Sequence, residues 1–242
     1  MRNIVVDIGN TRTKVGVFEN GVLVTHHYDP TTEVLKSLQQ DINDPVMVST
    51  VGHGVEELHV LFEKSKHFIV FDRSLKLPLS LRYDTPKTLG LDRIAAAIGA
   101  LTLYPAHDLL VIDAGSCITV DLVTKEQQFA GGIISPGARM RFKAMHVFTD
   151  KLPLVEWNPF DRSGLTLPGL STQECMRSGV LKGMQFEIEG YVRYYSAQYP
   201  DLKVIMTGGD AQYFENIINT PIFTEDSLVL IGLNRVLEYN VA

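Results

Sequence analysis

The stretch that decides the fold is Ile4–Thr11, IVVDIGNT, in which an apolar run ends in an aspartate, a glycine and two polar residues. The pattern returns at Leu109–Thr119, LLVIDAGSCIT. In each copy we expect a strand followed by a turn whose glycine lets a ligand approach the backbone and whose aspartate can hold a hydrated cation. Two such turns suggest a phosphate site built from two parts of the chain.

The two copies align at a constant spacing. Four pairs of residues are each 106 positions apart, as 113 is from 7: Asp7 and Asp113, Gly9 and Gly115, Asn10 and Ser116, Thr13 and Thr119. A shift near half of the 242-residue chain predicts two duplicated halves rather than a short repeat. We place these halves at residues 1–107 and 108–242.

Composition narrows the class of protein. With 45% hydrophobic and 21% charged residues, the chain can form one large domain or two modest ones with cores. The net charge of −6 and the absence of a basic run make nucleic acid an unexpected partner. Cys117 and Cys175 have no metal-binding spacing, and no leader or membrane-length apolar stretch is present, so we expect a cytoplasmic protein without a membrane anchor.

Hydrophobic periodicity predicts an α/β fold of two βββαβαβ-type halves, with mixed sheets flanked by helices. The first half has predicted strands at 3–8, 13–18, 22–27, 46–50 and 68–71, with helices around 34–38 and 55–62. The second has strands at 109–113, 118–123, 129–134 and 203–207, with helices at 139–148 and about 171–199. A helix at 92–104 joins the halves, Asn20-Gly21 marks a tight hairpin, and residues 150–169 form an ordered or semi-ordered loop. This duplicated arrangement resembles the ribonuclease H-like fold of the actin-like ATPases, which include sugar kinases, Hsp70 and actin.

Two segments could cradle a nucleotide. Asp7–Lys14, DIGNTRTK, combines backbone N–H groups at a glycine turn with hydroxyls, a lysine and a carboxylate that could serve magnesium. The second copy offers Asp113, Ser116 and Thr119, with Asp121 on the same strand face as Thr119. Either segment could instead be a plain turn with local capping. No P-loop and no dinucleotide-binding glycine motif is present.

The segment Gly90–Arg93 opens an apolar helix. Asp92 is a good N-cap there, and it could also act as a general base toward a substrate hydroxyl while Arg93 offsets phosphoryl charge. Glycine turns at Gly131–Gly137 and Thr207–Asp210 precede further helices. They either face phosphates or sugar, or they only connect a strand to a helix through residues with positive φ. Ser171–Glu174 fits a capping box, which leaves the hydroxyl of Thr172 for a substrate carboxylate or for solvent.

Taken together, these motifs resemble type III pantothenate kinase from the first strand to the final helix. The ordered series is Asp7-x-Gly-Asn-Thr, Tyr83 with Pro86 and Gly90-x-Asp92-Arg93, Asp113-x-Gly-Ser-x-x-Thr-x-Asp121, Gly131-Gly132 with Ser135-Pro136-Gly137, Thr172 with Ser178-Gly179, and Thr207-Gly208-Gly209-Asp210. The series departs from the family at Ser116, where Thr is frequent, and at Leu91, where Ala is frequent. The loop 150–169 matches least.

The resemblance implies ATP-dependent phosphorylation of pantothenate to 4′-phosphopantothenate, the first step of coenzyme A synthesis, by direct in-line transfer. It implies ATP binding by Asp7, Ile8, Gly9, Asn10, Thr11, Arg12, Thr13, Lys14 and Ser116. It implies pantothenate contacts from Tyr83, Gly90, Leu91, Asp92, Arg93 and Thr172, with Asp92 as proton acceptor. Asp113 would hold potassium or ammonium, magnesium would lie near Asp7, and the protein would be a homodimer in which Thr172 could act across the interface.

Two other functions remain open from the sequence. A different small-molecule kinase of the same superfamily would share the nucleotide turns, although the Tyr83–Arg93 block argues against it. A transcriptional accessory factor without catalytic activity is the alternative from another class, and the acidic charge balance and the full set of active-site residue types argue against that.

Overall fold

The computed structural model describes residues 1–9, 11–39, 41–50, 55–161 and 163–241. Two compact units are present. The first contains Met1–Ala106, Glu126–Phe129 and the C-terminal segment from Ser227, and the second contains His107–Lys125 and Ala130–Asp226. The predicted division after residue 107 concerned duplicated halves and stays a prediction. The compact units differ from it because the C-terminal segment joins the first unit.

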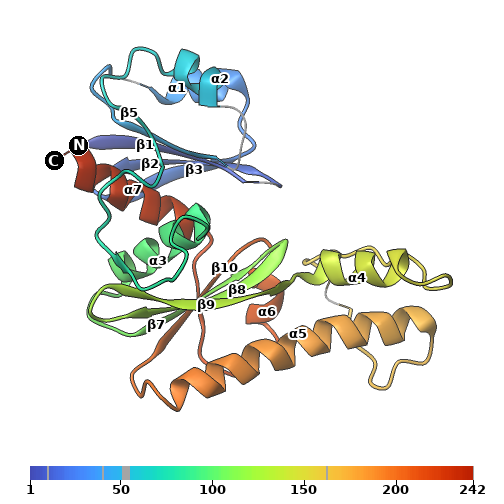
Figure 1. Ribbon diagram of the computed structural model, residues 1–242. Coiled ribbons are helices and arrows are strands. Elements are labelled where there is room, and N and C mark those ends of the chain that lie inside the picture. Colours follow the sequence, from blue (N-terminus) through green and yellow to red (C-terminus); the bar gives the residue numbers. More distant parts are fainter. Residues whose placement is uncertain (10, 40, 51–54, 162, 242) are drawn as a thin grey trace. The chain divides into compact units, whose positions relative to one another are not determined.

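The first unit is built on a five-stranded mixed sheet in the order β3-β2-β1-β4-β5 (Figure 1). Its strands are β1 (Arg2–Ile8), β2 (Thr13–Glu19), β3 (Val22–Tyr28), β4 (Val46–Thr50) and β5 (Phe68–Val70). The β1–β2 and β2–β3 pairs are antiparallel, and the β1–β4 and β4–β5 pairs are parallel. The turn between β2 and β3 has φ of 50° at Asn20 and 81° at Gly21, which agrees with the predicted Asn-Gly hairpin.

Helices cover both faces of this sheet. On one face, α1 (Thr32–Leu38) and α2 (Val55–Leu61) pack on the β1 side chains of Ile4 and Val6. On the other face, α7 (Leu228–Val241) packs on β1, β2 and β4, and α3 (Leu91–Leu103) packs on α7 (Figure 1). Because strand side chains alternate, Asp7 shares the α7 face with Val5. The α3–α7 pair therefore lies on the face to which Asp7 belongs.

The second unit repeats the strand order. Its strands are β7 (Leu109–Ala114), β8 (Cys117–Thr124), β9 (Gln128–Pro136), β10 (Lys203–Thr207) and β11 (Phe223–Thr224), and they run β11-β10-β7-β8-β9 across the sheet. The two central strands, β7 and β10, are parallel, as β1 and β4 are. This match supports the predicted duplication. The sequence missed β6 (Ser80–Leu81), because two residues carry no periodicity; it pairs with Gln128 and Phe129.

Three helices complete the second unit: α4 (Ala138–Val147), α5 (Thr172–Ser196) and α6 (Ala211–Glu215). Ser171 caps α5 by accepting the Glu174 N–H at 3.2 Å, as the capping-box pattern predicts. The return arm differs, because the Glu174 carboxylate accepts the N–H of Leu170 at 2.7 Å instead of that of Ser171. In the part of the chain that the structure describes, no helix is both long enough and apolar enough to cross a membrane.

The loop 150–169 is irregular, as predicted, and its described residues are tied to the second unit. Trp157 is 7% exposed and belongs to the core beneath α5. Ser178 Oγ donates to the carbonyl of Thr166 at 2.7 Å, and Arg177 pairs with Asp161 at 2.7 Å. Buried apolar anchors and these bonds from α5 account for its order.

Candidate active site

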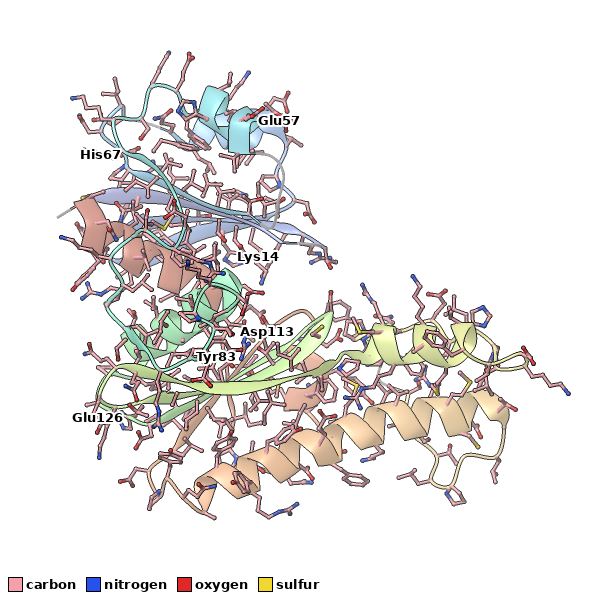
Figure 2. The ribbon with its side chains drawn as sticks, viewed as in Figure 1. Lys14, Glu57, His67, Tyr83, Asp113 and Glu126 are labelled. Carbon is pink, nitrogen blue, oxygen red and sulfur yellow. The ribbon has the colours of Figure 1, made fainter. Side chains whose placement is uncertain are left out.

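Strand register brings a row of polar side chains together at one end of the first sheet. Asp7 lies directly opposite Lys14 on β2 and beside Ser49 on β4, and Lys14 lies opposite Tyr28 on β3. Directly opposed residues share a face of the sheet. We call Tyr28, Lys14, Asp7 and Ser49 the first polar row. Figure 2 labels Lys14, the second residue of β2.

The electrostatics of this row centre on Asp7. Burial raises the pKa of its carboxyl to about 6, and the Lys14 ammonium and a hydrogen bond from Ser49 oppose that rise. The negative charge of Asp92 also contributes to the rise and is included in this value. Asp92 is therefore an electrostatic neighbour of Asp7, although it comes from α3. Ser49 could not be predicted from the sequence, because only the parallel pairing of β1 and β4 places it beside Asp7.

The turn after β1 is closed by backbone bonds. Gly9 N–H donates to the carbonyl of Arg12 at 3.0 Å, and Thr13 N–H donates to the carboxylate of Asp29 at 2.8 Å. The Arg12 side chain lies 3.8 Å from Asp29 and stays largely exposed, as does Thr11. Ile8 ends β1, and Asn10 lies outside the described residues. The predicted phosphate turn is thus a short, hydrogen-bonded loop beside the first polar row.

Asp92 stands in the first turn of α3, two positions further into the helix than the N-cap. The N-cap is Gly90, Leu91 is the first helical residue and Asp92 the second, so the predicted capping role of Asp92 is wrong. Its exposed carboxylate accepts the N–H of Arg93 at 2.8 Å. A Cβ on Gly90 would lie 2.4 Å from Asp92 Oδ1. Glycine at position 90 therefore leaves the space that the Asp92 carboxylate uses.

Phe129 joins two of the predicted substrate residues. The Arg93 guanidinium carbon lies 5.6 Å from the centroid of this buried ring, and the Tyr83 ring meets it edge-on at 6.0 Å. Arg93 is only 6% exposed, in contrast to the exposed Asp92 beside it. Figure 2 labels Tyr83, which follows β6. Sequence reasoning missed Phe129, since an aromatic residue at a strand start usually indicates core packing.

Arg73 holds the segment that leads into α3. Its guanidinium donates to the carbonyl of Pro86 at 2.7 Å and to that of Leu89 at 2.6 Å. Both bonds connect an exposed side chain to the backbone just before Gly90. The sequence showed no sign of this role, because a lone arginine in a loop has no pattern.

The second unit carries the equivalent row. Asp113 lies opposite Thr119 on β8 and beside Thr207 on β10. We call Thr119, Asp113 and Thr207 the second polar row. Here the sequence alignment needs a correction of one residue. The partner of Asp7 is Lys14, so Thr119 corresponds to Lys14 and not to Thr13, because the turn after β7 is one residue shorter.

Two turns that contain glycine pack closely against the segment Asp113–Ser116. Gly208 has φ of 99°, and a Cβ on it would lie 2.4 Å from both Asp113 Oδ1 and the carbonyl oxygen of Ala114. Gly137 N–H donates to the carbonyl of Ser116 at 3.1 Å, and the Ser116 side chain is exposed. Both glycines are thus needed for close backbone approach. The positive φ expected after β10 is confirmed at Gly208.

Asp210 anchors the loop 150–169 to the same turn. Its backbone N–H donates to the carbonyl of Ala114 at 2.8 Å, and its carboxylate accepts the indole N–H of Trp157 at 2.9 Å. Burial raises the pKa of Asp210, while the Trp157 bond and the charge of Arg139 lower it. Thr172 is the first residue of α5 and is exposed.

The chain resembles known proteins over nearly its whole length. Residues 3–194 match the sequence profile of the family described as type III pantothenate kinase. A type III pantothenate kinase of Cytophaga hutchinsonii is 43% identical over 242 residues, which cover 99% of this chain and all of that protein.

Two solved structures share the fold. A Campylobacter jejuni protein described as a conserved Baf family transcriptional activator has a TM-score of 0.63 at 22% identity and covers 98% of each chain. A glucokinase from an Antarctic psychrotroph has a TM-score of 0.51 at 12% identity and covers 98% of this chain and 99% of its own. At these identities the likeness concerns fold alone, and it agrees with the actin-like ATPase and sugar kinase architecture predicted from the sequence. The family profile and the full-length identity establish that the chain belongs to the type III pantothenate kinase family.

Proposed function

We propose that this chain transfers the γ-phosphoryl group of ATP to the primary hydroxyl of pantothenate, the first step of coenzyme A synthesis. The observation that carries the proposal is the membership of the type III pantothenate kinase family, together with the proximity of two carboxylates in the first unit, where the charge of Asp92 acts on Asp7. One carboxylate lies beside a lysine at the phosphate turn, and the other is exposed at the start of α3. A kinase needs such a pair, one group on the nucleotide side and one on the acceptor side.

Asp92 is the proposed general base. Its carboxylate is exposed and held by one backbone N–H, so it can accept a hydrogen bond from a substrate hydroxyl. The hydroxyl oxygen then attacks the γ-phosphorus in line, the bond from that phosphorus to the β–γ bridging oxygen breaks so that ADP leaves, and the hydroxyl proton passes to Asp92. Positioning of the reactants supplies most of the rate enhancement in phosphoryl transfer. A single base, Asp92, at the start of α3 is therefore sufficient for the proton transfer.

The residues proposed to bind ATP are 7–14, and Ser116 is proposed as a further nucleotide contact. The Asp7 carboxylate fits magnesium, because burial raises its pKa, the charge of Asp92 adds to that rise, and a divalent cation nearby would favour the charged form. Bound magnesium would offset the charge of the phosphates. No group of three His, Cys, Asp or Glu side chains suited to a metal occurs among the described residues, so phosphate oxygens and water would complete the shell.

Asp113 is the proposed site for potassium or ammonium. Its carboxylate lies next to the hydroxyl positions Thr119 and Thr207, and oxygen donors of this kind fit a hard monovalent cation. The Gly208 turn would keep the carboxylate in place. The cation would reduce repulsion between Asp113 and the phosphates.

Pantothenate would contact Tyr83, Gly90–Arg93 and Thr172. Arg93 and Tyr83 pack on the same Phe129 ring, which would make that side of the pocket rigid. We further propose a homodimer in which Thr172 acts across the interface. The second unit exposes a group of large apolar side chains that a second copy could cover: Met140, Val147, Phe148, Leu154, Phe160, Leu167, Leu170, Phe186 and Tyr194.

The test is an ATP consumption assay with pantothenate beside a panel of sugars, in potassium, ammonium and sodium buffers. We expect activity with pantothenate alone, in potassium or ammonium. Asp92→Asn should abolish phosphorylation while ATP still binds, because the amide preserves the shape of the side chain but accepts no proton. Turnover of a sugar would favour the other small-molecule kinase, and inactivity on every acceptor would favour a regulator. Near wild-type turnover by Asp92→Asn would remove the base assignment.

A further inference from the structure

The two polar rows differ at one position that the register aligns. In the first row the residue opposite the aspartate is Lys14, and in the second it is Thr119. On the other side both aspartates have a hydroxyl residue, Ser49 or Thr207. Two of the three positions that the rows share therefore agree in chemistry, and only the position opposite the aspartate changes from a cation to a neutral hydroxyl.

The difference has an electrostatic consequence. Lys14 lies directly opposite Asp7, so its ammonium places a positive charge beside that carboxylate. At the aligned position Thr119 has no formal charge to contribute. A monovalent cation from solution at Asp113 would add the positive charge that the first row receives from its own chain.

We propose that Thr119 is the residue that makes the second row depend on a monovalent cation, because it stands where the first row carries a lysine. The inference rests on the proposed function and adds to it a determinant of the cation requirement. A lysine at position 119 should place its ammonium beside Asp113 and take over the role of potassium. The Thr119 hydroxyl itself would be an oxygen ligand of the ion.

The experiment compares wild type, Thr119→Lys and the uncharged variant of similar length, Thr119→Gln. Pantothenate phosphorylation is measured in potassium and in sodium, and thermal unfolding is measured against potassium concentration without ATP. Wild type should lose about tenfold or more of its rate in sodium and gain roughly 5 °C in Tm at potassium well above Kd. Thr119→Lys should have similar rates in both salts and no potassium-dependent change in Tm. Thr119→Gln should remain inactive in sodium.

The outcomes separate the two proposals. A wild type inactive on pantothenate in every salt refutes the proposed function. If wild type is active and depends on potassium, the Thr119→Lys variant tests the role of Thr119. A variant that still loses rate in sodium and still shows the potassium-dependent Tm shift refutes that role. If Thr119→Lys does not fold, Thr119→Val decides: the proposal requires a half-saturating potassium concentration raised about tenfold, with the maximal rate retained. An unchanged potassium titration of that variant overturns it.

Discussion

The Gly90→Ala substitution should separate the position of the Asp92 carboxylate from the stability of the fold. The added Cβ would lie 2.4 Å from Asp92 Oδ1, whereas every other atom within reach is at 3.6 Å or more. The backbone at Gly90 has φ of −56° and ψ of 133°, which alanine adopts without strain. The only group that must move is therefore the carboxylate proposed as the base, by roughly 1 Å to reach normal van der Waals distance.

The expected magnitudes differ between activity and stability. A displacement of about 1 Å in a catalytic group costs on the order of 100-fold in rate, or about 2.7 kcal/mol of transition-state stabilisation. The free energy of unfolding should change by about 1 kcal/mol or less. Alanine is a poorer N-cap than glycine by several tenths of a kcal/mol, and the lower entropy of the unfolded chain offsets this by about 0.4 to 1 kcal/mol. The Tm should therefore shift by no more than about 2 to 4 °C.

The assay is steady-state kcat with pantothenate and ATP, beside thermal unfolding of the same preparations. Gly183→Ala is the matched control, because a Cβ there meets no atom within 4 Å on α5. The double variant Gly90→Ala with Asp92→Asn should be no slower than Asp92→Asn alone, since both changes affect one group. A Gly90→Ala enzyme with kcat within twofold of wild type would refute the reasoning, as would full additivity in the double variant.

Three further substitutions test other parts of the site. Burial raises the pKa of Asp7 from 3.8 to about 6, so the free energy of unfolding falls as the pH rises between these values. The Asp7→Asn substitution should therefore raise the free energy of unfolding by up to about 2 to 3 kcal/mol at pH 7 and by little near pH 4. Thermal unfolding measured across pH tests this. Gly208→Ala should lower Tm by roughly 5 to 10 °C and weaken potassium binding, because the new methyl meets the Ala114 carbonyl oxygen and Asp113 at 2.4 Å with φ at 99°; an unchanged Tm would count against this packing. Phe186→Glu should shift a dimer toward monomer in light scattering, since the ring is 62% exposed on the apolar face; an unaffected dimer would place the interface elsewhere.

Most strands and helices could be predicted because each carries its own local signal. Short apolar runs, the Asn-Gly hairpin and the Ser171 cap are all visible within short windows of the sequence. Strand β6 has two residues and exists only because β9 offers a partner. The assignment of α7 to the first unit depends on packing against β1 and α3, so no window of the sequence contains it.

The candidate site was predictable in residue type but not in geometry. Asp7, Asp92 and Asp113 each follow a recognisable local pattern, so the sequence indicates which carboxylates to consider. Their neighbours come from other elements: Ser49 by parallel pairing, and Phe129 by packing under Arg93. Such contacts join residues far apart in the chain, and a single sequence without periodicity at those positions cannot reveal them.

A one-residue difference in turn length changes how the duplication is understood. Constant spacing aligns Thr13 with Thr119 and makes the two turns look alike, because both positions carry threonine. Strand pairing aligns Lys14 with Thr119 instead, since β2 begins its pairing five residues after Ile8 and β8 begins four residues after Ala114. A residue slip of one would move every side chain to the opposite face of the sheet, so the register, and not the spacing, decides which residue faces each aspartate. The two aspartates therefore occupy the same place in equivalent sheets with different charges opposite them, which supports the proposal that the second row depends on a monovalent cation from solution.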